Sequence, residues 1–202
     1  MAKILLLFAH PVLEKSRVHA CLLRHIRNLD GITFHDLYEQ YPDFDIDIKH
    51  EQRLLLQHDV IILQHPFYWY STPAILKQWQ DLVLEHGWAY GSKGKMLTGK
   101  RIFNVISCGG RKEAYQPGGY NRLTIRQLLG PIEQTARLCN MVYMPPFVVH
   151  GTHKLNAADM ELYGVQYEQL LIALANDRIN EAEWQQADYL NDLIPIPEHI
   201  QS

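Results

Sequence analysis

Residues 65–73 read His65-Pro66-Phe67-Tyr68-Trp69-Tyr70-Ser71-Thr72-Pro73 and join an apolar run to the start of a helix. The apolar run, residues 59–63, is short, β-branched and unbroken, which is typical of a strand buried on both faces. We expect Ser71 or Thr72 to cap a helix that has Pro73 at its first position. Open α/β sheets bind ligands beyond the carboxyl ends of their strands. The aromatic residues 67–70, here called the aromatic shelf, therefore indicate a flat aromatic ligand.

Strands and helices alternate on both sides of this stretch. We expect strands over 3–8, 32–37, 100–107 and 141–150, besides the one that begins at Val60. Helices are expected over 17–29, 49–57, 73–85, 123–138 and 156–175. This order predicts an α/β fold with a doubly wound, five-stranded parallel sheet and helices on both faces. Pro145 and Pro146 interrupt the last strand and mark a bulge or an edge.

The chain of 202 residues predicts one domain over 1–176, followed by a tail over 177–202. Within the tail, residues 181–193 predict one more amphipathic helix, which Ile194-Pro195-Ile196-Pro197 ends. We expect this tail to pack either on the body or on a second subunit.

The overall composition excludes several classes of protein. Lys and Arg number 19 against 22 Asp and Glu, a net charge of −3, so the chain has no basic footprint for nucleic acid. The three cysteines, an odd number without close pairing, favour a reducing compartment. The apolar residues 4–9 are too few for a membrane span and lack a cleavage site, so we expect a cytoplasmic protein.

The eleven histidines do not predict a metal site. His150 and His153 lack further ligands at a suitable spacing, and the others are scattered. Residues 43–47 alternate aspartates but lack the glycine and the closing glutamate of a calcium loop. Cys108 has no evident base, and we interpret it as a buried small hydrophobe.

The loop after the first strand, residues 10–19, has neither the glycines of a dinucleotide fingerprint nor the lysine of a P-loop. It places Ser16 at the start of a helix, where backbone N–H groups and the helix dipole favour a phosphate. Lys15 or Arg17 would add positive charge. The alternative interpretation of Ser16 is an ordinary helix cap.

Three further loops follow predicted strands or lie beside them. The aromatic shelf either contacts a ligand or packs its loop onto the sheet, and its last three residues, Tyr68, Trp69 and Tyr70, cannot all face inward. Gly109 and Gly110 allow the backbone to approach a ligand closely. Residues 111–121 supply Tyr115, Tyr120 and Asn121. A phenol there either packs or donates a hydrogen bond to a substrate oxygen that gains charge.

Residues 65–79, together with His86-Gly87-Trp88-Ala89-Tyr90-Gly91 and Phe8-Ala9-His10-Pro11, resemble the flavodoxin-like NAD(P)H:quinone reductases of the DT-diaphorase family. Residues 36–38 and 41–48 resemble one bacterial branch, the ancillary subunits of glutathione-regulated potassium-efflux systems. The resemblance covers about residues 3–175.

The resemblance implies FMN, or FAD as the alternative, bound without a covalent bond. It implies hydride transfer from NAD(P)H to the flavin and then to a quinone, with both substrates using one pocket in turn. It also implies a homodimer with the pocket at the subunit interface. For the potassium-efflux branch it implies a regulatory flavoprotein docked on an antiporter at the inner membrane face. A one-electron carrier like flavodoxin is disfavoured, because such carriers are usually strongly acidic and this chain, with a net charge of −3, is nearly neutral.

Residue roles can be carried over by position. The resemblance places His10, Ser16, Arg17, Val18 and His19 around the flavin phosphate and ribityl chain, Phe67, Tyr68, Trp69 and Tyr70 along the ring, and Ser107, Cys108, Gly109 and Gly110 on its other side. The family's catalytic tyrosine falls on Tyr115, and its histidine falls on Asn121, with Tyr120 beside it. Asn121 cannot change protonation at neutral pH, and His19 stands where the family often has asparagine.

Overall fold

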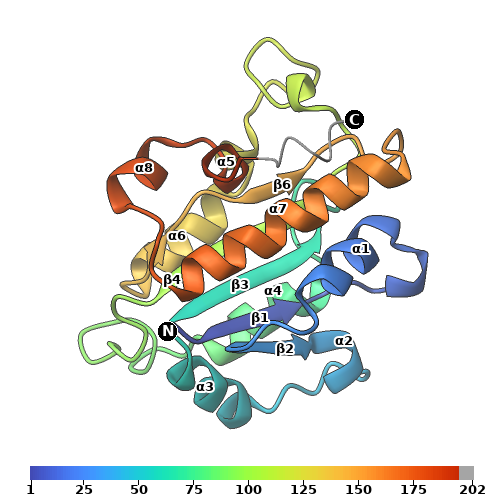
Figure 1. The fold of residues 1–202 in the computed structure, drawn as a ribbon. Coiled ribbons are helices and arrows are strands. Elements are labelled where there is room, and N and C mark those ends of the chain that lie inside the picture. Colours follow the sequence, from blue (N-terminus) through green and yellow to red (C-terminus); the bar gives the residue numbers. More distant parts are fainter. Residues whose placement is uncertain (196–202) are drawn as a thin grey trace.

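A parallel sheet lies between two layers of helices in the computed structural model, which describes residues 1–195 (Figure 1). The strands are β1 (Ile4–Phe8), β2 (Ile32–Asp36), β3 (Val60–Pro66), β4 (Arg101–Ser107), β5 (Val142–Tyr143) and β6 (Phe147–Val149). The order is β2-β1-β3-β4-β5, and β6 also pairs with β4. The predicted doubly wound α/β fold is confirmed, and the fifth strand position is shared by two short strands.

The break in the fifth strand lies at the two prolines. Val142 and Tyr143 pair with the start of β4, and 147–149 pair with its end. Pro145 and Pro146 lie between these two segments. Proline has no N–H to donate to the neighbouring strand, so pairing with β4 is interrupted there. The predicted interruption at this edge of the sheet is confirmed.

Two hydrophobic cores lie on the two faces of the sheet. In β1, Leu5 and Leu7 belong to one core, whereas Ile4, Leu6 and Phe8 belong to the other. Alternation along a strand sends successive side chains to opposite faces, so an unbroken apolar strand fills both cores. β2 lies at the open edge of the sheet and is only partly buried.

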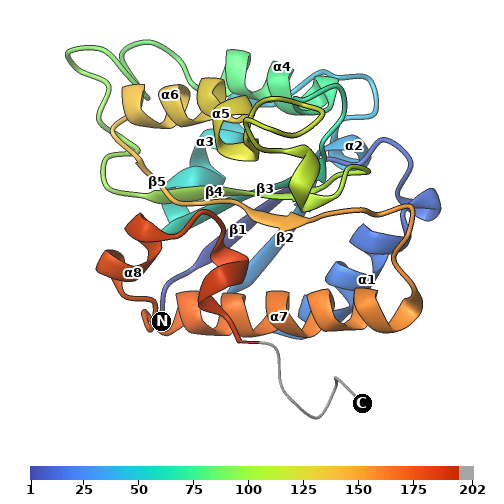
Figure 2. The same ribbon diagram turned by 90° about the horizontal axis from the view of Figure 1, so that it is seen from above.

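The helices divide between the two faces, as Figure 2 shows. α1 (Arg17–Ile26) and α7 (Ala157–Ala175) cover one face, and α3 (Ile48–Gln57), α4 (Ala74–Val83) and α6 (Gly130–Leu138) cover the other. Short elements complete the chain: η1 (Leu13–Lys15), α2 (Leu37–Gln40), η2 (Lys112–Ala114), α5 (Ile125–Leu128), α8 (Glu181–Gln186) and η3 (Leu190–Leu193).

Two expected helices differ from the sequence prediction. The helix expected over 123–138 is divided into α5 and α6, and the second begins at Gly130-Pro131. α4 begins at Ala74 with Pro73 as its N-cap, and no side chain caps it. The predicted cap by Ser71 or Thr72 is therefore wrong. The Ser71 N–H bonds the Tyr68 carbonyl in a tight turn, which keeps this segment outside the helix.

The helix expected over 181–193 is also divided, into α8 and η3. Leu190, the first residue of η3, is fully buried, and its N–H donates to the Pro146 carbonyl at 3.0 Å. The Asn191 side chain accepts the Val148 N–H at 2.8 Å. These contacts hold the segment on β6. Residues 196 and 197 of the expected proline stop lie outside the described residues. No helix among residues 1–195 is long and apolar enough to cross a membrane.

Candidate functional site

A cavity of about 590 Å³ opens at the carboxyl ends of β1, β3, β4 and β6. It is lined by His10, Val12, Lys15, Ser16, Arg17, Val18, Pro66, Phe67, Tyr68, Ser107, Cys108, Gly109, Thr152 and His153. Residues from loop 10–19, from the aromatic shelf and from loop 107–110 therefore meet at one place. A groove of about 620 Å³ lies against α1 and β2, but its lining is mostly aliphatic and offers few converging polar groups.

The first turn of α1 forms one end of the cavity. The Ser16 Oγ accepts the His19 N–H at 3.2 Å and so caps the helix. Its own hydroxyl hydrogen is still available to a ligand. Within residues 1–195 the N–H groups of Arg17 and Val18 have no acceptor. Free N–H groups at the positive end of a ten-residue helix favour an anion, so the Ser16 cap is compatible with anion binding here.

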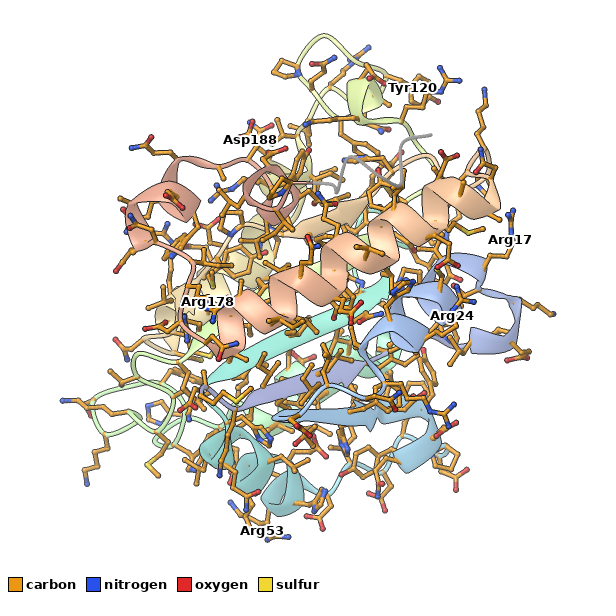
Figure 3. The ribbon with its side chains drawn as sticks, in the orientation of Figure 1. Arg17, Arg24, Arg53, Tyr120, Arg178 and Asp188 are labelled. Carbon is orange, nitrogen blue, oxygen red and sulfur yellow. The ribbon has the colours of Figure 1, made fainter. Side chains whose placement is uncertain are left out.

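Arg17 and His10 lie at this end of the cavity. The exposed Arg17 donates from Nη2 to the Leu155 carbonyl at 3.2 Å and projects from the start of α1 (Figure 3). The His10 Nδ1 accepts the Val12 N–H at 3.1 Å. Burial lowers the pKa of His10, so its neutral ring carries the proton on Nε2. His10 is therefore a neutral donor beside the helix start.

A buried hydrogen-bond chain fixes the carbonyl that precedes the aromatic shelf. The His65 Nδ1 lies 2.9 Å from the Pro66 oxygen, which can only accept, so this nitrogen carries the proton. Burial lowers the pKa of His65 to about 4, and its Nε2 accepts from the Asn104 amide at 3.0 Å. The Asn104 oxygen accepts the Tyr143 hydroxyl at 2.7 Å. Because the Pro66 carbonyl can only accept, it determines which group donates in every hydrogen bond back to Tyr143.

A second buried chain reaches the cavity from the other face of the sheet. The Tyr167 hydroxyl donates to Gln64 Oε1 at 2.9 Å, and Gln64 Nε2 lies 3.2 Å from His19 Nδ1. His19 Nε2 then lies 2.9 Å from Ser107 Oγ. His19 is fully buried, and burial holds its pKa well below the ordinary value. It lies beneath the cavity and supports Ser107 rather than lining the cavity itself.

The aromatic shelf is divided between the cavity and the solvent. Phe67 and Tyr68 line the cavity, whereas Trp69 is 93% exposed and Tyr70 is half-exposed. Trp69 and Tyr70 have φ values of 50° and 64°, in the left-handed region that non-glycine residues rarely occupy. The expectation that three aromatics cannot all face inward is confirmed, and the strained pair turns outward.

The glycines after β4 leave room for neighbouring side chains. A Cβ on Gly109 would lie 2.7 Å from His153 Nε2, and one on Gly110 would lie 2.8 Å from the Tyr115 ring. His153 and Thr152 line the cavity, although the sequence analysis considered His153 only as a metal ligand. Their position just after the last strand was the signal that could have identified them.

Tyr115, Tyr120 and Asn121 do not line the cavity in this single chain. Tyr115 is buried beneath Gly110, 5.8 Å from the His150 ring, and burial raises its pKa. Tyr120 is 90% exposed on a projecting loop (Figure 3). Asn121 Oδ1 accepts the Tyr70 hydroxyl at 3.2 Å. Asn121 and Tyr70 therefore link the loop to the exposed half of the aromatic shelf.

Cys108 is buried beside the cavity, and its Sγ lies 3.4 Å from His150 Nδ1. The sequence had shown no base near it. Burial nevertheless raises the pKa of the Cys108 thiol to about 12. The thiol stays protonated at neutral pH and serves as a small packing group.

The fold and this cavity define a doubly wound α/β protein with an open cavity at the carboxyl ends of its strands. The chain belongs to the family of proteins with a flavodoxin-like fold, whose sequence model matches residues 2–171.

Particular relatives share most of their length with this chain. The glutathione-regulated potassium-efflux system ancillary protein KefG of Serratia proteamaculans (strain 568) is 46% identical over 165 residues, 82% of this chain and 90% of its own. General stress protein 14 of Treponema denticola, solved in complex with FMN, has a TM-score of 0.79 at 38% identity and covers 85% of this chain and 99% of its own. An NADPH-quinone reductase from P. pentosaceus has a TM-score of 0.75 at 36% identity and covers 83% of this chain and 96% of its own.

Proposed function

We propose that this protein is a flavin-dependent NAD(P)H:quinone oxidoreductase that holds FMN in the cavity at the strand ends. The observation that carries this proposal is the meeting of an anion-binding helix start, an aromatic wall and a glycine turn around one cavity. A relative of 38% identity was solved with FMN, and another of 36% identity is named an NADPH-quinone reductase.

The residues present fit FMN at both ends of the cavity. The free N–H groups of Arg17 and Val18, with the Ser16 hydroxyl, would hold the phosphate. Phe67 and Tyr68 would border the ring, and Ser107 with Gly109 would close its other side. We assign FMN rather than FAD because one phosphate-binding end has been found and a solved relative contains FMN.

A bound flavin supplies an acceptor that takes hydride from NAD(P)H and then passes it on to a quinone. The chain's own residues position it and limit access of water. Tyr115 would donate from beneath Gly110, and Asn121 and Tyr120 would act at the rim beside Tyr70. The nicotinamide and the quinone would use the same open side in turn, which predicts ping-pong kinetics.

The test is turnover by the purified, FMN-loaded protein. We expect rapid NADPH oxidation with a benzoquinone acceptor and parallel lines in double-reciprocal plots. A protein that takes up FMN but transfers no hydride to benzoquinone would contradict the enzymatic proposal.

We also propose a homodimer in which a second copy covers the exposed aromatics at the rim. Trp69 and Tyr120 are 93% and 90% exposed, although they border the proposed site. Large exposed aromatic side chains are typical of interfaces. The protein would act in the cytoplasm.

A second candidate function is favoured by the relative named as a potassium-efflux ancillary protein, which is 46% identical. On this proposal the flavoprotein binds a potassium-efflux antiporter at the inner membrane face and activates it. Antiporter activity in vesicles, with and without this protein, tests the second candidate separately. Activation without quinone turnover would favour the regulatory function over the enzymatic one.

A further inference from the structure

The interface between α1 and α7 contains a group of metal-ligating side chains that the proposed flavin chemistry does not use. Cys21 and His25 lie one turn apart on α1, and Glu161 lies opposite them on α7. One ligand atom from each lies within 4.8 Å of the other two. The Cys21 Sγ is 3.7 Å from Glu161 Oε1, and His25 Nε2 is 2.8 Å from Glu161 Oε2.

The second nitrogen of His25 has a carboxylate partner. His25 Nδ1 lies 3.4 Å from Glu168 Oε2, two turns along α7 from Glu161. In metal sites a ligating histidine usually gives its other ring N–H to a carboxylate or carbonyl, which fixes the ring. Glu168 is placed to do so here.

A glycine in the middle of α7 makes room for the His25 ring. A Cβ on Gly164 would lie 2.3 Å from His25 Cδ2, so every other residue would displace the ring. Glycine is unfavourable in a helix interior, and its presence here has a steric reason. The site is therefore shaped around His25 from both helices.

We propose that Cys21, His25 and Glu161 form a zinc site, with Glu168 as the partner of His25. A thiolate, an imidazole and a carboxylate are ligands of Zn²⁺, with bonds of about 2.0–2.3 Å. Small side-chain shifts from the observed separations of 2.8 and 3.7 Å would place the three groups around one ion. A solvent water would complete the coordination, because the Glu161 side chain is 45% exposed. The Cys21 proton goes to solvent when the thiolate binds.

Arg24 is the competing cation at this site. Its Nη2 pairs with Glu161 Oε1 and lies 3.4 Å from Cys21 Sγ, which also lies 3.4 Å from the Met160 carbonyl. The Arg24 side chain is largely exposed where α1 passes α7, so it can leave without unpacking the core (Figure 3). No sequence spacing points to this group, because Glu161 lies 136 residues from His25.

Calorimetric titration with Zn²⁺ tests the site on the intact protein, in two buffers of different ionisation heat. We expect one ion per chain and release of the Cys21 proton. Cys21→Ser should abolish the proton release, and His25→Gln should weaken binding at least ~10-fold. Glu168→Gln should weaken it by about 10–100-fold. Cys139→Ser, which changes another buried free cysteine outside the cluster, should bind as the natural chain does.

Arg24→Ala gives an independent measurement that does not remove a ligand. It should tighten zinc binding, because it removes the competing cation. The proposal is overturned if the natural chain binds no Zn²⁺, or if Cys21→Ser binds with unchanged affinity and proton release. It is also overturned if Arg24→Ala leaves the affinity unchanged.

Discussion

At the scale of single residues, two buried neutral histidines support the cavity from beneath. His65 fixes the Pro66 carbonyl, and His19 contacts the Ser107 hydroxyl. Both are fully buried, and neither could be charged there without a large desolvation cost. Their role is to position groups that would touch the ligand, and their protonation makes this positioning sensitive to acid.

We predict that His65 remains neutral, with its proton on Nδ1, down to about pH 5. Burial lowers its pKa from an ordinary value of 6.5 to about 4 in the folded chain. In the unfolded chain His65 binds a proton below pH 6.5, whereas in the native chain it does so only below about pH 4. Between these pH values acid therefore favours unfolding. The free energy of unfolding should therefore fall by about 3 kcal/mol from this group between pH 6.5 and 4.

Nitrogen NMR of labelled histidine measures both the tautomer and the titration of His65. A proton on Nε2, or a titration midpoint near the ordinary histidine pKa, would show that the hydrogen bonds from Tyr143 through Asn104 and His65 to Pro66 are assigned incorrectly. His150 is also neutral, with a pKa lowered by burial to about 4, and it contributes to acid sensitivity in the same direction.

Tyr115→Phe is predicted to lower quinone turnover by at least ~10-fold while FMN remains bound. The ring still packs beneath Gly110 and against Phe67, so only the hydroxyl donor is lost. Stopped-flow reduction and reoxidation of the flavin would separate the two half-reactions. Unchanged kinetics in both would remove Tyr115 from the catalytic residues.

At the scale of elements, the start of α1 has a cap that stabilises the helix and a proposed role in binding the FMN phosphate. Ser16→Ala should cost about 1 kcal/mol of folding free energy, because the cap to the His19 N–H is lost. It should also weaken FMN binding by at least ~10-fold through the missing donor to the phosphate. Asp47→Ala removes the cap of α3, a helix of the same length away from the cavity, and should leave FMN affinity unchanged. Equal FMN affinities in both variants would place the phosphate elsewhere.

α3 is held by a buried carboxylate. Glu51 is fully buried and accepts hydrogen bonds from His35, from the Tyr41 hydroxyl at 2.6 Å and from the Trp79 indole at 2.8 Å. Burial alone would raise the pKa of Glu51, but these donors outweigh it and lower the pKa. The segment between β2 and α3 depends on this acceptor.

Glu51→Gln is predicted to destabilise the fold by about 3 kcal/mol. The glutamine NH₂ group would replace a carboxylate oxygen and would face a hydrogen-bond donor, which would be left without an acceptor. Urea unfolding gives the value directly. Glu39→Gln, at an exposed position in α2, is the matched control and should change stability by less than about 0.5 kcal/mol. A loss as small as that of the control would mean that the buried donors find other acceptors.

The alternation of strands and helices was predictable because buried parallel strands are apolar without interruption, as in β1 and β3. The loops at 10–19, 67–70 and 107–110 were predictable because strand ends converge in such a sheet. What the sequence could not predict depends on contacts between distant segments. Examples are the turn that excludes Ser71 from α4, the burial of His19 against Gln64, and the approach of His153 to Gly109.

At the scale of the whole molecule, the single chain leaves part of its proposed site exposed. Trp69→Ala should weaken self-association at least ~30-fold, because a buried interface tryptophan typically contributes about 2 kcal/mol. Leu138→Ala changes a large exposed side chain at the end of α6 and should not alter association. Sedimentation equilibrium of both variants measures this. A monomer at all concentrations in the natural chain would exclude the proposed interface.

The proposed function depends first on the binding of FMN in the cavity at the strand ends. Mass spectrometry of the cofactor released from the purified protein measures this. We predict FMN, at about one molecule per chain after incubation with added flavin. A colourless protein that releases no flavin, and takes none up from added FMN, would contradict the proposal.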